Sequence, residues 1–424
     1  MPNGVASDFK TQYGIFPPHP LFVERAKGSK IYDNDGNEYI DYCLGAGPAI
    51  LGHGHPKVIE AIKRQLDEGG TLGPFGAEDE LAVKLAKKIK ERYTHIDSLR
   101  FTSSGVEATS NAIRVARAYA KRDKIARFEG QYHGTHDYFL VSNLPPPPEL
   151  DGDPSLPPTI PGSAGIPQSV LDDVVTLPFN DLDACEKIIK RYRNQLAAVI
   201  MSPIHSYSVL LPRKGFLEGI REITEKHNIV LISDEVFLGY RVPPEFYGIT
   251  PDLVTLGKII GGGLPSGAFG GRRELMETLS GIGVKKPQEK VFHSGTFSGS
   301  PLVSAAGLAT LNALTEDAYR QINNTTAELV KGIKDILKDN KIDAQIPNAY
   351  STFDIVFTSS ELNSWRDILK ADVAKRRMMA YGLVNRGILF YISPHWVVTS
   401  LAHTKEDVEK TLESVAHTVK ELRE

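Results

Sequence analysis

Cysteine is scarce in this chain, with only Cys43 and Cys185 among 424 residues. No disulfide framework is predicted, and a reducing cytoplasm suits the chain. Apolar runs as long as the roughly 18 residues of a membrane span are also lacking, as is the charged-then-apolar order of a signal peptide. Neither sign of charge dominates, because the net charge is −3 with both signs interspersed, so a nucleic-acid footprint is not expected. We therefore expect a cytoplasmic protein with neither a membrane nor a nucleic-acid partner.

Buried strands and helices alternate through the middle of the chain. The segments LAAVIMSP and Ile229–Ile232 are apolar runs typical of strands covered on both faces, and GFLEGIREITEKHN between them has helical periodicity. This rhythm predicts an α/β fold with a mostly parallel sheet. From about residue 300 the pattern changes to long helices and short strands, which indicates a smaller α+β part. A chain of this length is expected to form two domains.

The stretch from Ile229 to Gly271 holds an acid and an amine near strand ends. Asp234 closes the apolar run, and Lys258 precedes three glycines. The carboxyl ends of parallel strands open onto the ligand crevice of such sheets. A carboxylate for a pyridine nitrogen and an amine for a Schiff base are what pyridoxal 5′-phosphate (PLP) requires. The stretch matches neither GxxxxGK[ST] nor GxGxxG. On residue pattern alone, a solvated lysine and an ordinary strand end remain an alternative.

Two further segments could complete a cofactor site. Ser104 and Glu107 form an S-x-x-E capping box that opens a helix, and the exposed N–H groups of Ser104, Gly105 and Val106 could bind a phosphate. Tyr132 and His133 offer flat rings for a planar group. The alternatives are an ordinary capped helix and simple aromatic packing.

Four histidines also invite a metal hypothesis. They are His53, His55, His133 and His136, but no cysteine or carboxylate lies at ligand spacing beside them. We therefore expect them to line turns and pockets, with no metal bound.

Motifs along nearly the whole chain resemble one enzyme family. YIDYCLGAGPAILGHGHP, SSGVEAT, RFEGQYHG, ISDEVFLGYRV, TPDLVTLGKIIGGGLPSGAFGG, HSGTFSGSP and SLAHT follow one another in order. They are similar to class III (subgroup II) PLP-dependent aminotransferases of fold type I, nearest the glutamate-1-semialdehyde 2,1-aminomutase branch. The resemblance implies a large PLP-binding domain over residues 51–300 and a small C-terminal domain over residues 301–424. Residues 1–50 would contribute to the small domain and to a dimer.

The same resemblance implies residue roles. Lys258 would form the Schiff base, and Asp234 would hold the pyridine nitrogen. Val236 and Tyr132 would cover the two ring faces, with His133 beside the ring. The phosphate would bind Ser104, Gly105 and Val106 of one subunit and Thr296 of its partner, so the resemblance implies a homodimer with shared sites.

Departures from the family concern the residues around the substrate. Lys10 stands where the aminomutases have an arginine, His395 replaces a glutamate, and SPIHSY replaces EPVAGN. We expect an aminotransferase that moves an amino group between an amino acid or amine, such as a β- or D-amino acid with an aromatic group, and a keto acid. The alternatives are the aminomutase itself and a non-catalytic protein of the same fold. The candidate substrate residues, which could equally be packing residues, are Lys10, His205, Tyr207, His395 and Trp396.

Overall fold

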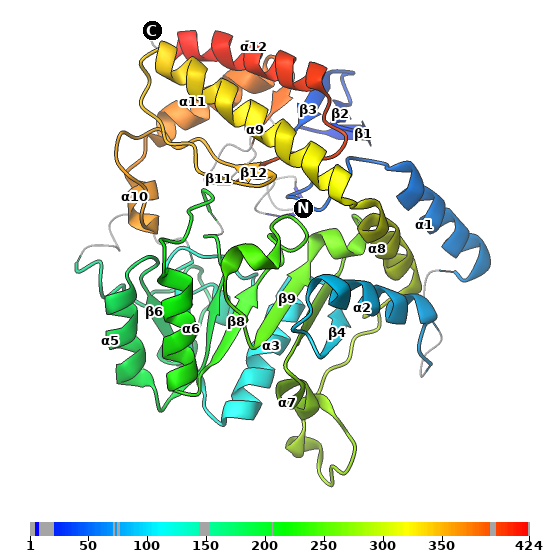
Figure 1. Cartoon of the computed structure of the whole chain (residues 1–424), viewed down its shortest axis with the longest axis vertical. Coiled ribbons are helices and arrows are strands. Elements are labelled where there is room, and N and C mark those ends of the chain that lie inside the picture. The colour runs from blue at the N-terminus through cyan, green and yellow to red at the C-terminus, as the bar shows by residue number, and fades with distance from the viewer. Residues whose placement is uncertain are drawn as a thin grey trace.

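A seven-stranded sheet forms the centre of the larger part of the molecule (Figure 1). The computed structural model describes residues 5–7, 21–70, 73, 77–143, 152–205, 207–390 and 396–422. In spatial order, the strands are β4 (Ser98–Thr102), β10 (Gly267–Gly271), β9 (Leu253–Gly257), β8 (Val230–Asp234), β7 (Leu196–Met201), β5 (Lys124–Phe128) and β6 (Val174–Leu177). β10 is antiparallel to both neighbours, and all other pairs are parallel. The predicted mostly parallel sheet is confirmed.

Helices cover both faces of this sheet, which explains why its strands are continuous apolar runs. In β7, Ala198 and Ile200 pack on one face, and Val199 and Met201 pack on the other. The flanking helices are α3 (Gly105–Ala120), α4 (Gln168–Asp172), α5 (Leu182–Tyr192), α6 (Phe216–Lys226) and α7 (Arg273–Met276). Short 3₁₀ turns are η3 (Asp137–Phe139), η5 (Pro244–Tyr247), η6 (Lys258–Gly261), η7 (Glu277–Leu279) and η8 (Pro287–Glu289).

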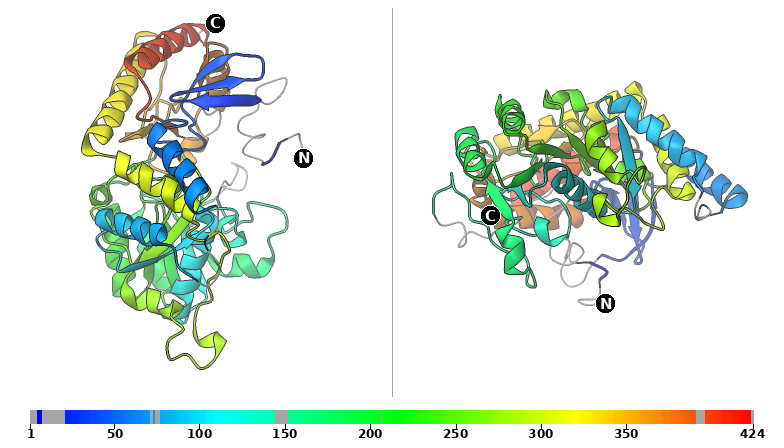
Figure 2. Two further views of the ribbon diagram at one scale, coloured as in Figure 1. Left: turned by 90° about the vertical axis from the view of Figure 1, so that its right-hand side faces the viewer. Right: turned by 90° about the horizontal axis from the view of Figure 1, so that it is seen from below.

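The N-terminal strands share a sheet with the C-terminal part. β1 (Val23–Lys27), β2 (Lys30–Asp33) and β3 (Glu38–Asp41) form a meander, and β3 pairs in parallel with β13 (Ile388–Leu389). Figure 2 shows these strands at the same end of the molecule as the last helices. The alternating apolar positions of KIYDNDGNEYIDY predict a hairpin with its turn at Asp35-Gly36, and this hairpin is confirmed as β2 and β3. The domain boundaries at residues 50 and 300 stay a prediction.

Long helices complete the smaller part and connect it to the larger one. The connecting helices are α1 (Pro56–Glu68), α2 (Glu80–Arg92) and α8 (Pro301–Ala313), which pack together beside the sheet. The smaller part contains α9 (Glu316–Asp339), α10 (Trp365–Leu369), α11 (Val373–Val384), α12 (Lys405–Glu421), β11 (Asn348–Ala349), β12 (Thr352–Phe353) and β14 (Val397–Val398). The periodicity of residues 405–424 predicts a last helix that is capped at Thr404 and has Val408, Leu412, Val415, Val419 and Leu422 inward. Thr404 caps α12 and the three valines are buried, whereas Leu412 and Leu422 are only partly buried.

Helical periodicity predicts Leu66 and Tyr119 on the inner faces of their helices, but both side chains are exposed. Tyr119 of α3 is 44% exposed and Leu66 of α1 is 46% exposed, because both lie in the last turns of their helices, beyond the packed surface. The high proline and glycine content of residues 144–168 predicts a long surface loop. The structure has no regular element between 152 and 167, and residues 144–151 lie outside the described part. Within the described residues, no helix is long and apolar enough to cross a membrane.

Candidate active site

Asp234 and Lys258 lie at the carboxyl ends of neighbouring parallel strands. Asp234 is the last residue of β8 and is paired with Thr255, while Lys258 directly follows β9. The Asp234 carboxylate is buried and accepts three hydrogen bonds. The donors are His133 Nδ1 at 2.7 Å, Thr255 Oγ1 at 2.9 Å and the Val236 N–H at 3.1 Å. These bonds fix the orientation of the carboxylate.

His133 lies beneath the site as a partner of Asp234. Burial lowers the pKa of His133, so the ring is neutral at physiological pH and Nδ1 carries the proton that Asp234 accepts. The Thr109 hydroxyl donates to the His133 carbonyl at 2.9 Å, which anchors the backbone to α3. His133 Nε2 is buried and has no hydrogen-bond partner among the described residues. His133 therefore orients the acid.

Lys258 has the properties of a nucleophilic amine. Its backbone has φ of +50°, a conformation that non-glycine residues rarely adopt outside constrained functional positions. Burial, with a smaller effect from the Arg241 guanidinium, lowers the pKa of Lys258 to about 8, and Asp234 opposes this shift. A substantial fraction of the amine is therefore neutral near physiological pH.

Val236 joins the start of α3 to the end of β9. A Cβ added at Gly105 would lie 2.5 Å from Val236 Cγ1, and one added at Gly257 would lie 3.0 Å from the same atom. Both glycines are therefore required for this close approach. The contact places Val236, the predicted ring contact, and the start of α3, the predicted phosphate site, next to the end of β9, which Lys258 follows.

The N-terminus of α3 is capped nearly as predicted. Ser104 Oγ accepts from the Glu107 N–H at 3.3 Å, but the Glu107 carboxylate accepts from the Ser103 N–H rather than from Ser104. The second bond of the capping box therefore comes from the N–H of Ser103, one residue before the cap. Among the described residues, no hydrogen bond uses the N–H groups of Gly105 and Val106. These groups stay available for an anion at the positive end of the helix dipole.

Aromatic side chains extend from Tyr132 toward the smaller part of the molecule. The Tyr132 and Tyr207 ring centroids are 6.4 Å apart, Tyr207 is 6.4 Å from Trp396, and Trp396 is 3.9 Å from Phe237. Tyr132 and Phe237 are only partly buried. Tyr207 and Trp396 are buried. Tyr132 and Phe237 are the sequence neighbours of His133 and Val236, which both hydrogen-bond Asp234, so the two ends of the aromatic cluster connect to residues that hold this carboxylate.

The remaining predicted substrate and phosphate residues lie in different environments. His205 is buried, its Nε2 bonds the Glu129 carbonyl at 3.0 Å, and burial lowers the pKa of His205 to about 4. Thr296 lies exposed in the segment between η8 and α8. Lys10 and His395 lie outside the described residues.

Sequence reasoning missed two buried charged groups next to the site. Glu235 accepts from the Tyr93 hydroxyl and the Ser233 hydroxyl, both at 2.9 Å, and burial raises the pKa of Glu235 to about 7. Arg241 donates to the carbonyl of Gly47 at 2.7 Å and to Ser351 Oγ at 2.7 Å. For Glu235, a charged residue directly after an apolar strand was the available signal. Arg241, in the turn segment beyond β8, carried no such signal.

Comparison with known proteins identifies the family. The sequence profile described as Aminotransferase class-III matches residues 15–419. A glutamate-1-semialdehyde 2,1-aminomutase of Thermodesulfovibrio yellowstonii is 39% identical, over 100% of this chain and 96% of its own. The chain belongs to the class III aminotransferase family. The resemblance found in the sequence motifs is thus confirmed.

Solved structures agree with this class III assignment. An omega-transaminase from Sphaerobacter thermophilus superposes with a TM-score of 0.94 at 33% identity, covering 100% of this chain and 95% of that one. A structure described as a transaminase with PLP bound gives a TM-score of 0.88 at 28% identity, with coverage of 100% and 95%. The fold-type I architecture and the PLP dependence predicted from sequence are confirmed. The protein is a PLP-dependent aminotransferase or a closely related aminomutase.

The site of this class III enzyme fits PLP on its own geometry. Residues that would touch the cofactor are partly exposed, whereas Asp234 and His133 are buried beneath them. The free N–H groups of Gly105 and Val106 suit a phosphate, and the Asp234 carboxylate suits a protonated ring nitrogen. The partly exposed set consists of Ser104, Gly105, Val106, Tyr132, Val236 and Lys258.

Proposed function

We propose that this enzyme transfers an amino group between two molecules, from an amino acid or amine with an aromatic group to a keto acid. The observation that carries the proposal is the aromatic cluster of Tyr132, Tyr207, Trp396 and Phe237, whose ends adjoin His133 and Val236, the residues bonded to Asp234. Such rings favour an aromatic donor, including a β- or D-amino acid, by offset and edge contacts. The similarity to an omega-transaminase supports transfer between two molecules.

In this proposal, Asp234 and Lys258 have separate roles in the reaction. Bound PLP supplies an aldehyde carbon that accepts the amino group and a ring that withdraws electrons. Asp234, oriented by His133 and Thr255, holds the proton on the ring nitrogen. The neutral Lys258 amine takes the proton from the substrate carbon and returns it to the carbon that receives the amino group. Its lowered pKa lets one group act as base and then as acid.

Gly105, Val106, Val236 and Tyr132 would position the cofactor in this proposal. The first two present N–H groups to the phosphate, while the Val236 and Tyr132 side chains cover the ring faces. Their partial exposure and the tight contact of Val236 with Gly105 support these roles. Tyr207 and Trp396 would line the substrate side of the site. The sequence adds Lys10 and His395 as further candidate substrate residues. His205 would pack behind these side chains.

We also propose that the enzyme acts as a homodimer. The segment around Thr296 exposes large apolar side chains, with Ile282 at 92%, Phe292 at 71% and Phe297 at 57% exposure. Exposed apolar patches of this kind mark association surfaces. A second copy covering this segment would bring Thr296 to the partner's phosphate site. Light scattering should report a dimer, and Phe297→Asp should shift the mass toward a monomer.

Two free thiols, Cys43 and Cys185, support a cytoplasmic location.

A second candidate function is intramolecular amino transfer. It is favoured by the 39% identity to a protein named glutamate-1-semialdehyde 2,1-aminomutase. An aminomutase isomerises one substrate and needs no external acceptor, whereas an aminotransferase releases a second product.

A donor and acceptor screen tests the proposal. Purified enzyme loaded with PLP is mixed with glutamate, alanine, β-amino acids and D-amino acids, and conversion of the cofactor to its amine form is followed by absorbance. Aromatic β- or D-amino acids should convert the cofactor, and a keto acid should restore it with release of a new amino acid. Turnover of glutamate-1-semialdehyde alone, with no aromatic donor accepted, would replace the proposal with the aminomutase function.

A further inference from the structure

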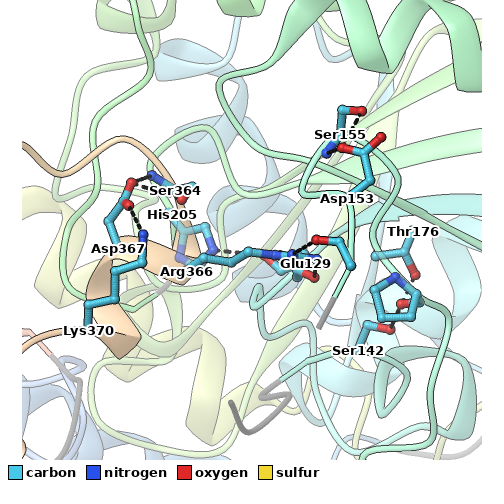
Figure 3. A network of polar contacts seen from close by, with 12 residues as sticks. Glu129, Ser142, Asp153, Ser155, Thr176, His205, Ser364, Arg366, Asp367 and Lys370 are labelled. Atoms are coloured by element: carbon cyan, nitrogen blue, oxygen red, sulfur yellow. Dashed lines mark hydrogen bonds and ion pairs between the residues drawn. The ribbon is translucent and has the colours of Figure 1, made fainter. Parts of the chain in front are cut away.

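A buried ion pair connects α10 to the turn that precedes Tyr132. Arg366 donates from Nε to Glu129 Oε2 at 3.1 Å and from Nη2 to Glu129 Oε1 at 3.2 Å. The two side chains are only 10% and 5% exposed. Figure 3 shows Arg366 extending from its helix directly to Glu129. The partners are 237 residues apart in sequence, so this contact joins the smaller part of the molecule to the edge of the active site.

Trp365, the neighbour of Arg366, packs on the same turn. A Cβ added at Gly130 would lie 2.4 Å from Trp365 Cγ, so only glycine lets the indole lie against the backbone. Gly130 also has φ of +76°, which favours glycine for a second reason. The indole stacks on His205 at 5.8 Å with an interplanar angle of 9°, and His205 bonds the Glu129 carbonyl.

The residue after this turn continues into the cofactor-facing segment. Gln131 bonds both the N–H and the carbonyl of Ser202, at 2.8 and 2.9 Å. Tyr132 and His133 follow at once, and His133 Nδ1 is 2.7 Å from Asp234. The turn is therefore held by α10 on one side and by the end of β7 on the other. A shift of Glu129 or Gly130 would be passed on to Tyr132 and His133 within four residues.

We propose that Arg366 and Trp365 are positioning residues that set Tyr132 and His133 against the cofactor and Asp234. The inference rests on the proposed function, since it concerns the same site. Neither residue would touch substrate or cofactor. A buried ion pair adds little net stability over an apolar pair, but its fork geometry fixes one arrangement of two segments. Fixed placement is what the ring contact and the histidine–aspartate bond require.

The smaller part offers a matched control for this pair. Arg376 pairs with Asp354 through two hydrogen bonds, and these side chains are 12% and 1% exposed. Both Arg376 on α11 and Asp354 after β12 lie within the smaller part, so their pair does not hold the turn before Tyr132. Arg366→Met and Arg376→Met thus remove similar buried pairs, and only the first loosens the turn.

The experiment compares wild type, Arg366→Met, Arg366→Lys and Arg376→Met as PLP-loaded enzymes. The readouts are thermal unfolding, the circular dichroism of the bound cofactor, the dissociation constant for PLP, and kcat with the preferred donor. Arg366→Met should change the cofactor dichroism and lower kcat by about 10²-fold, the loss expected for a misplacement near 1 Å. Arg366→Lys, which keeps the charge but loses the fork, should give an intermediate loss. Arg376→Met should lower only the unfolding temperature.

Equal behaviour of Arg366→Met and Arg376→Met in dichroism, PLP affinity and kcat would overturn the inference. If Arg366→Met does not fold, Arg366→Lys decides, because wild-type dichroism and kcat in that variant would also overturn it. Failure of wild type to bind PLP covalently or to transfer an amino group would refute the proposed function instead. The two failures are therefore distinguishable.

Discussion

Replacing Gly105 with alanine should weaken PLP binding through Val236. The new Cβ would lie 2.5 Å from Val236 Cγ1 and 3.0 Å from Cγ2, whereas ordinary contacts begin at 3.4 Å. Val236 must therefore move by about 1 Å toward the expected ring position or displace the start of α3. Its N–H is bonded to Asp234 at 3.1 Å, so the backbone resists this movement. Overpacking of this kind costs about 1–3 kcal/mol, which sets an upper limit of roughly 5- to 150-fold on the loss of affinity, reached when the whole cost falls on the PLP-bound state.

Titration of the apoenzyme with PLP, followed by protein fluorescence, measures the effect of Gly105→Ala. The double variant Gly105→Ala/Val236→Ala removes the clashing methyl groups and provides the internal control. We expect it to bind PLP more tightly than Gly105→Ala alone, because contacting residues are not additive. If Gly105→Ala binds PLP with wild-type affinity, or if the double variant does not recover affinity, the close packing of Val236 against the start of α3 is refuted.

Three pH-dependent predictions follow from the other buried groups. Arg241→Met removes a cation near Lys258, so the pH midpoint for reaction of the apoenzyme with PLP should move upward, while Arg241→Lys should keep it. The pKa of Glu235 rises from 4.5 to about 7 on folding, so wild type loses stability as pH rises through this window. Chemical unfolding should show that the free energy of unfolding of Glu235→Gln, relative to wild type, rises by up to about 3 kcal/mol between pH 5 and pH 8. His403 is buried, and its Nδ1 lies 2.9 Å from Ser400 Oγ. Burial lowers the pKa of His403 from 6.5 to about 4, so stability is lost as pH falls from 6.5 to 4, and His403→Gln should flatten that slope, also by about 3 kcal/mol.

The parallel sheet and the strand-end pair could be predicted because they depend on local patterns. Apolar runs separated by helical periodicity indicate a covered sheet, and parallel strands place their carboxyl ends at one edge. Asp234 and Lys258 therefore lie at the ends of neighbouring strands, as the sequence suggests. The Ser104 cap is likewise a local signal, since donor and acceptor are three residues apart.

Contacts between distant segments could not be predicted in the same way. Periodicity does not specify that Arg366 pairs with a residue 237 positions earlier, or that Trp365 lies on Gly130. Helix periodicity also does not show where a packed surface ends, which is why Tyr119 was wrongly assigned to the inner face of α3. His205 was a candidate substrate residue, yet it packs under Trp365 and bonds a backbone carbonyl.

Covalent attachment of PLP to Lys258 is the central claim and can be measured directly. The PLP-loaded enzyme is reduced with borohydride, digested and examined by peptide mass spectrometry, with Lys258→Ala as the control. We expect the reduced cofactor on the peptide that contains Lys258, and no labelled peptide from the variant. Label on another lysine, or unchanged labelling in Lys258→Ala, would contradict the account.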